Sequence, residues 1–86
     1  MNILEEEVKK IVAKIAKKDP SQISPGLKIF EDLDIDSLRG TEMLARISQK
    51  FKIFIPDGKL GEISTVGDAL KMIKKFLKKG HKPAEE

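Results

Sequence analysis

The chain has 86 residues, 17 of them Lys or Arg and 14 Asp or Glu, with a net charge of +3 at pH 7. This length suits a single small domain with a modest core. The absence of Cys excludes disulfides and thiolate metal sites, and the absence of Trp and Tyr argues against stacking on nucleic-acid bases. No apolar run approaches the roughly 20 residues of a membrane span, and the N-terminus lacks the basic region of a signal peptide. We therefore expect a protein of the cytoplasm.

The first predicted helix runs from Asn2 to Lys17 or Lys18. One apolar stripe at helical spacing is predicted to face the core; it contains Leu4, Val8, Ile11, Val12 and Ile15. Asn2 and Glu5 have the spacing of a capping pair. Asp19-Pro20 ends the helix, because proline disfavours helical geometry in the residue before it.

A long connection follows, from Asp19 to Asp36, and proline, glycine and serine interrupt it. A loop of this length in a small domain is usually functional or held by its own apolar side chains. The side chains expected to hold it are Ile23, Leu27, Ile29, Phe30, Leu33 and Ile35. A single helical turn is possible from Leu27 to Phe30.

The second predicted helix extends from Ser37 to about Phe51. Its expected buried face consists of Leu38, Met43, Leu44, Ile47 and Phe51, with Thr41 and Ala45 as small contacts. Gly40 weakens such a helix by about 0.5–1 kcal/mol relative to Ala, so its presence suggests a close approach by another group. The following Lys52–Ile55 segment is predicted to be an extended linker with Ile53 and Ile55 turned inward.

One weak and one strong helical segment complete the domain. The residues from Asp57 to Ile63 predict one or two irregular turns. Thr65 and Asp68 then form a capping-box pattern, and an apolar period follows in Val66, Ala69, Leu70, Ile73, Phe76 and Leu77. Gly80 is the expected end of this last helix. The predicted fold is all-α: a small bundle of three main helices and one short irregular helix, spanning residues 1–80, with a flexible tail at 81–86.

An acidic segment precedes the second helix. Glu31, Asp32, Asp34 and Asp36 lead to Ser37, which lies where the helical period begins. Unpaired backbone N–H groups point outward at such a position, and a negative group is favoured there. Two interpretations remain open: Asp36 and Ser37 only start the helix, or the Ser37 hydroxyl is the attachment point of a phosphate-linked group.

Catalytic and metal chemistry have little support. His81, the only histidine, lies in the tail, and no base lies near Ser37 in the sequence, so we expect no enzyme. Asp32, Asp34 and Asp36 alternate like the first ligands of a calcium loop. A calcium loop, however, requires glycine at its sixth position and glutamate at its twelfth. If Asp32 is the first position, these places are taken by Ser37 and Met43. We therefore expect no metal site.

The stretch Glu-Asp-Leu-Asp-Ile-Asp-Ser-Leu resembles the acyl carrier proteins. The later Phe-Lys-Ile-Phe-Ile-Pro-Asp and Ser-Thr-Val-Gly-Asp-Ala stretches (51–57 and 64–69) extend the resemblance along most of the chain. It implies that a phosphopantetheinyl transferase attaches 4′-phosphopantetheine to Ser37, that Asp36 helps hold the metal ion of this transfer, and that Leu38 contacts the transferase. The thiol of the arm then carries an acyl group as a thioester. The same family interpretation makes Met43, Leu44, Ile47, Ile63 and Ala69 candidates for lining an acyl-chain shelter, although each also suits an ordinary core.

The second helix departs from the family pattern because it is basic. Arg39, Arg46, Lys50 and the adjoining Lys52 outnumber Glu42, whereas the family usually has acids here. We therefore predict a divergent, monomeric carrier that serves fatty-acid, lipid or polyketide-type enzymes of a specialised pathway, through acidic docking surfaces on those enzymes. The predicted docking residues are Arg39, Glu42, Met43 and Arg46, and we expect no nucleic-acid partner and no membrane span. The alternative is a basic helical module that binds an anionic partner, nucleic acid or a membrane surface, through its lysine-rich last helix.

Overall fold

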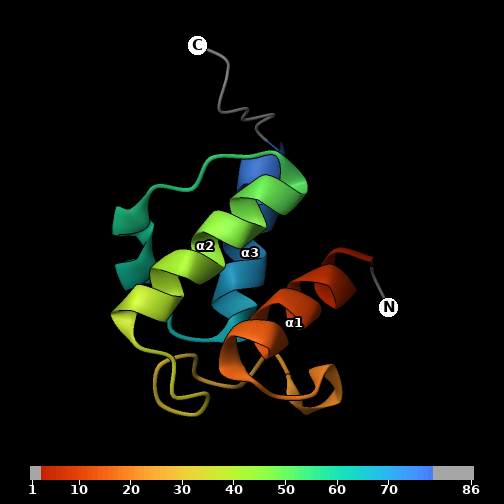
Figure 1. The fold of residues 1–86 in the computed structure, drawn as a ribbon. Coiled ribbons are helices and arrows are strands. Elements are labelled where there is room, and N and C mark those ends of the chain that lie inside the picture. Colours follow the sequence, from red (N-terminus) through yellow and green to blue (C-terminus); the bar gives the residue numbers. More distant parts are fainter. Residues whose placement is uncertain (1–2, 79–86) are drawn as a thin grey trace.

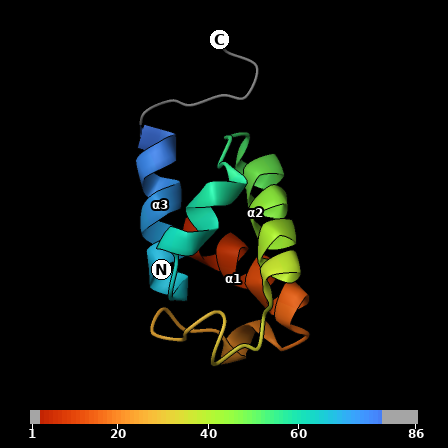
Figure 2. The same ribbon diagram turned by 90° about the vertical axis from the view of Figure 1, so that its left-hand side faces the viewer.

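A computed structural model describes residues 3–78 and confirms the predicted all-α class (Figure 1). The elements are α1 (Ile3–Ala16), the 3₁₀ helix η1 (Pro20–Gln22), α2 (Ser37–Phe51), the 3₁₀ helix η2 (Asp57–Glu62) and α3 (Val66–Lys78). Figure 2 shows η2 on one face between α2 and α3, with α1 behind them and the 19–36 connection across one end. Within residues 3–78, none of the helices has the length and apolar character that crossing a bilayer requires.

The first helix ends at Ala16, earlier than the sequence predicts. Lys17 adopts a left-handed conformation with φ of 60°. The amide of Lys17 donates to the Lys14 carbonyl (3.3 Å) and that of Lys18 to the Ala13 carbonyl (2.9 Å), which is the Schellman ending of a helix. Glycine usually occupies this left-handed position, so a lysine gave no signal there. The predicted Asn2 cap lies outside the described residues.

Apolar side chains from every main helix and from the long connection form one core. Its fully buried members include Val8 and Val12 of α1, Ile29 and Ile35 of the connection, Met43 and Ile47 of α2, and Val66 and Ile73 of α3. Leu4 and Ile11 only pack against its edge. The connection is held as predicted by Ile23, Ile29, Leu33 and Ile35, but Phe30 is exposed and Leu27 is half-buried.

The buried face of α2 is narrower than predicted. Met43, Leu44 and Ile47 are buried, whereas Leu38 is 79% exposed and Ala45 is exposed. Leu38 precedes Met43 by five residues, which is about 140° around a helix, so it lies away from the face that carries the buried residues of α2. The linker prediction is confirmed, since Ile53 and Ile55 are buried and Phe54 between them is exposed.

Gly40 is buried because η2 packs directly on it. A Cβ at this position would lie 3.0 Å from both Leu60 methyl carbons, which is well inside the 3.5–4.0 Å of a favourable carbon contact. The glycine therefore lets η2 approach the first turns of α2, an approach that the sequence suggested without identifying the partner.

Two loops pair with each other at the end of the bundle. Lys28 and Thr65 form an isolated antiparallel bridge. The Ile29 amide donates to the Ser64 carbonyl (2.9 Å) and the Val66 amide to the Leu27 carbonyl (3.0 Å). The possible helical turn from Leu27 to Phe30 is thus replaced by this pairing, which periodicity along one segment cannot reveal. The short helix η1 was also missed, although its Asp19 and Gln22 form a capping box.

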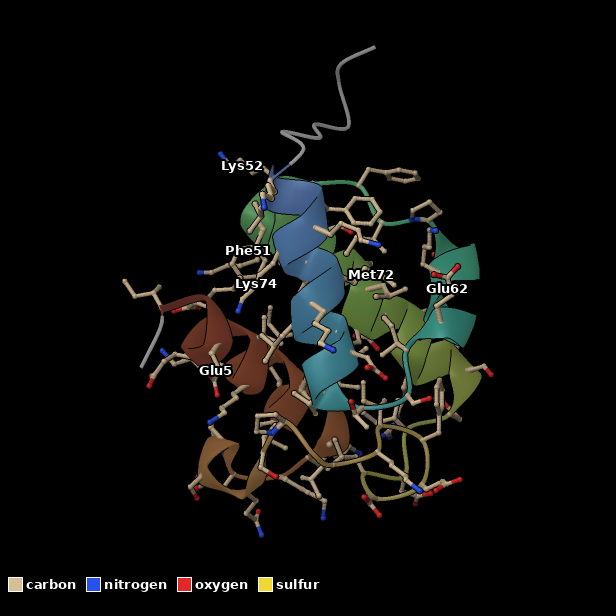
Figure 3. All side chains as sticks on the ribbon, turned by 180° about the vertical axis from the view of Figure 1, so that it is seen from behind. Glu5, Phe51, Lys52, Glu62, Met72 and Lys74 are labelled. Carbon is tan, nitrogen blue, oxygen red and sulfur yellow. The ribbon has the colours of Figure 1, made fainter. Side chains whose placement is uncertain are left out.

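The predicted capping box of α3 is present. The Asp68 amide donates to the Thr65 hydroxyl (3.1 Å), and the Asp68 carboxylate accepts from the amides of Thr65 (3.1 Å) and Ser64 (3.0 Å). Figure 3 shows Met72 and Lys74 on opposite sides of this helix. Leu77 is exposed, contrary to prediction. The expected end at Gly80 lies outside the described residues.

Gly40→Ala tests the contact between α2 and η2. Overpacking typically costs about 1–3 kcal/mol, against a helix gain of about 0.5–1 kcal/mol, so the free energy of unfolding should fall by about 1 kcal/mol. In a Leu60→Ala background the same change should be stabilising, because the added methyl then fills vacated space. Urea unfolding of the four proteins gives the coupling. Gly58→Ala, which meets no atom within 4 Å, is the control, and equal effects of Gly40→Ala in both backgrounds would contradict the contact.

Acid should weaken the start of α3. Hydrogen bonds from the backbone amides of Ser64 and Thr65 lower the pKa of Asp68 below its ordinary value of 3.8. The folded state therefore gains stability from the carboxylate above pH 3.8 and loses it as the pH falls through the lower folded-state pKa. The stability difference between wild type and Asp68→Asn should be largest at neutral pH and vanish in acid. Urea unfolding across this range measures it, with Asp57→Asn as the control. A difference independent of pH would contradict the assignment.

Candidate functional site

Asp36 is the N-cap of α2. Its backbone is extended, and its carboxylate accepts a hydrogen bond from the Arg39 amide (2.9 Å) while its carbonyl accepts from the Gly40 amide (2.8 Å). The buried neighbour Ile35 fixes this geometry, because its amide donates to the Ile29 carbonyl (3.3 Å). The paired loops therefore determine where α2 begins.

Ser37 is the first residue of α2 and is exposed. Since Asp36 already caps the helix, the Ser37 hydroxyl is not needed for that task, and no side-chain hydrogen bond engages it within residues 3–78. The amides of Ser37 and Leu38 likewise have no acceptor in this part of the chain. The site thus combines a free hydroxyl with two free N–H groups at the positive end of a helix.

Leu38 presents a large apolar side chain beside this hydroxyl. At 79% exposure it contributes little to the core. A single exposed leucine is common on protein surfaces. Its position next to Ser37 nevertheless gives an approaching protein an apolar contact beside the exposed hydroxyl.

Arg39 points toward the end of α1. It is half-buried, and its guanidinium donates to the Ile15 carbonyl (3.2 Å) in the last turn of that helix. A cation at a helix C-terminus is favoured by the helix dipole. This contact joins the start of α2 to the end of α1, a role for which the sequence gave no signal.

The other predicted docking residues differ in accessibility. Glu42 and Arg46 are exposed and form an ion pair of 3.0 Å on α2. Met43 is fully buried in the core, so it cannot belong to a docking surface as predicted. Lys50 pairs with Glu7 of α1 at 3.3 Å. Much of the positive charge of α2 is therefore paired.

The acidic residues before Ser37 form contacts within the loop. The Asp32 carboxylate accepts from the Lys28 amide (2.9 Å), and Glu31 pairs with the Lys28 ammonium (3.4 Å). Asp34 has φ of 56°, a left-handed conformation that aspartate tolerates better than most residues. Across residues 3–78 no three acids or histidines are arranged to hold a metal ion.

The five candidate shelter residues lie together in the core. Met43, Leu44, Ile47, Ile63 and Ala69 are all buried; the first three belong to α2, Ile63 follows η2, and Ala69 belongs to α3. They belong to one continuous core cluster in this structure.

This arrangement defines a carrier module. An exposed serine at a helix N-terminus can accept a group from another protein, and within residues 3–78 no base is hydrogen-bonded to its hydroxyl to activate it for chemistry of its own. The free amides and the helix dipole suit a phosphodiester, so the residues present fit a phosphopantetheine group. That group supplies a flexible arm whose thiol forms thioesters.

Comparisons with known proteins agree with this class. The family model described as "Phosphopantetheine attachment site" matches residues 6–73. The acyl carrier protein AcpP of Rhizobium meliloti is 39% identical over 75 residues, covering 87% of this chain and 96% of that protein. The meromycolate extension acyl carrier protein of Mycobacterium leprae is 34% identical over 89 residues, covering 99% of this chain and 77% of that protein.

A solved structure shows the same fold. The HMG-ACPI domain from the CurA module of Lyngbya majuscula matches with a TM-score of 0.74 at 22% identity, covering 90% of this chain and 78% of that domain. The chain belongs to the acyl carrier protein family. It is a non-catalytic carrier that holds acyl groups as thioesters on covalently attached 4′-phosphopantetheine. A phosphopantetheinyl transferase modifies it, and acyl-handling enzymes are its partners.

Substitutions of Asp36 should distinguish its hydrogen bond as the helix cap from its negative charge. Asp36→Ala should lower the free energy of unfolding by about 0.5–2 kcal/mol, whereas Asp36→Asn should retain most of the stability because asparagine caps equally well. Urea unfolding measures both. Glu31→Ala, which removes only an exposed ion pair, is the control. An Ala variant as stable as wild type would contradict the capping role.

Proposed function

We propose that Ser37 is the residue that carries the phosphopantetheine arm. The observation that supports this most directly is its exposed hydroxyl, which is unengaged within residues 3–78 at the first position of α2. Asp36 already caps the helix, so modification of Ser37 costs no structural hydrogen bond. The free amides of Ser37 and Leu38 would then face the phosphodiester.

The neighbours of Ser37 have separate roles in this proposal. Asp36 presents one carboxylate oxygen to the Arg39 amide and keeps the other for the Mg²⁺ ion of the transfer reaction, since this ion prefers one or two carboxylates together with phosphate oxygens. Leu38 is the apolar contact for the transferase. Both assignments extend the family resemblance to residues whose exposure permits them.

We further propose a specialised pathway for this carrier in fatty-acid, lipid or polyketide-type biosynthesis. Its α2 carries Arg39, Arg46 and Lys50 against Glu42, which favours enzymes with acidic docking surfaces. Arg39, Glu42 and Arg46 remain the proposed docking residues. One relative is named for a dedicated process, meromycolate extension, which shows that carriers at this level of similarity include specialised ones. The proposal includes a cytoplasmic monomer, as the resemblance implies for a carrier that exchanges partners.

The attachment point is tested by intact-mass measurement. The purified chain, incubated with coenzyme A and a broad-specificity phosphopantetheinyl transferase, should gain the mass of one phosphopantetheinyl group. Ser37→Ala should abolish this gain. Ser64→Ala, which removes another exposed serine hydroxyl near the start of a helix, is the matched control and should be modified like wild type. A mass gain that persists in Ser37→Ala would reject the assignment.

A further inference from the structure

A shallow, open hollow between α1 and α2 brings cations from the two helices together. Its lining comprises Lys10, Ile11 and Lys14 of α1 and Arg46, Gln49 and Lys50 of α2. These residues are far apart in the sequence, so their proximity emerges only from the packing of the two helices (Figure 1). Ile11 is partly buried against the core and gives the hollow an apolar component.

The lining contains four cations and no acid. Two acids lie beside it: Glu7 pairs with Lys50 (3.3 Å) and with Lys10 (3.7 Å), and Glu42 pairs with Arg46 (3.0 Å). Lys14 is exposed and has no ion pair within residues 3–78. Exposed ion pairs of this kind contribute little stability, so the paired cations can turn to an incoming carboxylate at small cost.

Other hollows in the described part of the chain have mixed charge. The hollow between η2 and α3 contains Glu62 and Asp68 beside three lysines, and Lys59 there pairs with Glu62 (3.4 Å). The hollow beside Phe30 contains an ion pair of Lys28 and Glu31. The one between α1 and η1 includes Glu6. Concavity and charge of a single sign thus coincide in the hollow between α1 and α2.

We propose that this hollow is the docking site for an acidic segment of a partner enzyme. Carboxylates of the segment would pair with Lys14, Arg46 and Lys50, an apolar side chain would contact Ile11, and Gln49 offers both a donor and an acceptor. The inference rests on the proposed function and makes it more specific, because it names the surface between α1 and α2 as the place where the acidic surface of a partner enzyme binds.

The position of the hollow suits a carrier. Arg46 follows Ser37 by nine residues of one helix, which corresponds to about 14 Å along its axis. An enzyme held at the hollow would therefore have the attachment point on the same rigid element, at a fixed distance. Charge complementarity at such a site sets the encounter rate and the choice of partner.

A synthetic amphipathic peptide can test the site. The probe is a helical peptide of glutamate and leucine, and its control is the same peptide with lysine in place of glutamate. Titrated into the full-length, phosphopantetheinylated protein at low ionic strength, the acidic peptide should shift the backbone NMR signals of residues 10–14 and 46–50. The basic peptide should not, and added salt should weaken the binding.

Matched charge-removing variants locate the site. Lys14→Gln with Arg46→Gln removes two charges from the proposed hollow and should weaken peptide binding roughly three- to tenfold. Lys71→Gln with Lys75→Gln removes two charges from the hollow between η2 and α3 and should change the affinity for the peptide less than twofold. All four positions are exposed, so both variants should fold, and backbone NMR spectra verify this.

Three results would overturn the proposal: no binding at millimolar peptide, equal weakening by both pairs of substitutions, or signal changes confined to α3. Anionic phosphatidylglycerol vesicles, tested in parallel, would also overturn it if they alone bound the hollow. Failure here leaves the mass gain at Ser37 intact, whereas failure of the proposed attachment point removes that gain, so the two outcomes are distinguishable.

Discussion

The fold depends on the pairing of the loop before α2 with the loop before α3. Three backbone hydrogen bonds join residues 25–29 to residues 64–67, and the third runs from the Gly67 amide to the Pro25 carbonyl at 2.9 Å. A Cβ on Gly67 would approach that carbonyl oxygen to 3.2 Å, so a small residue permits the close approach. Residues 64–67 lead into α3, and residues 25–29 belong to the connection that leads to α2. The pairing of these two segments therefore fixes the starts of α2 and α3 relative to each other.

The geometry of the proposed attachment site depends on this pairing of the two loops. Ile29 is bonded to Ser64, and Ile35 is bonded in turn to Ile29, so the backbone is held up to the residue before Asp36. Asp36 then supplies the cap, and the hydroxyl of Ser37 remains free for modification. The buried isoleucines of the long loop thus fix the position of Ser37, while the serine itself remains exposed to solvent.

Local patterns in the sequence predicted most of the helical architecture. The capping box at Thr65 and Asp68, the stripe of α1 and the inward-facing Ile53 and Ile55 each depend on neighbouring residues, and each is present. The sequence also placed Asp36 and Ser37 at a helix start, and the family resemblance identified the class of carrier, which the comparisons confirm.

What the sequence did not predict depends on contacts between distant segments. The exposure of Leu38 is an exception, because its place about 140° around α2 from the buried Met43 could have excluded it from the buried face. The partner of Gly40 is Leu60, twenty positions away, and the partner of Arg39 is a backbone carbonyl that has no sequence signature. The end of α1 also escaped precise prediction, because Lys17 occupies a left-handed position where glycine is the usual signal, whereas α2 ends at Phe51 as predicted.

The hydrogen bond from Arg39 to the Ile15 carbonyl has a consequence for recognition. The guanidinium has five N–H donors and uses one of them on this carbonyl, so the others can still pair with a carboxylate of a docked enzyme. The side chain is already held against α1, so less conformational entropy is lost when it binds that carboxylate. One arginine would then connect the end of α1, the start of α2 and the bound enzyme.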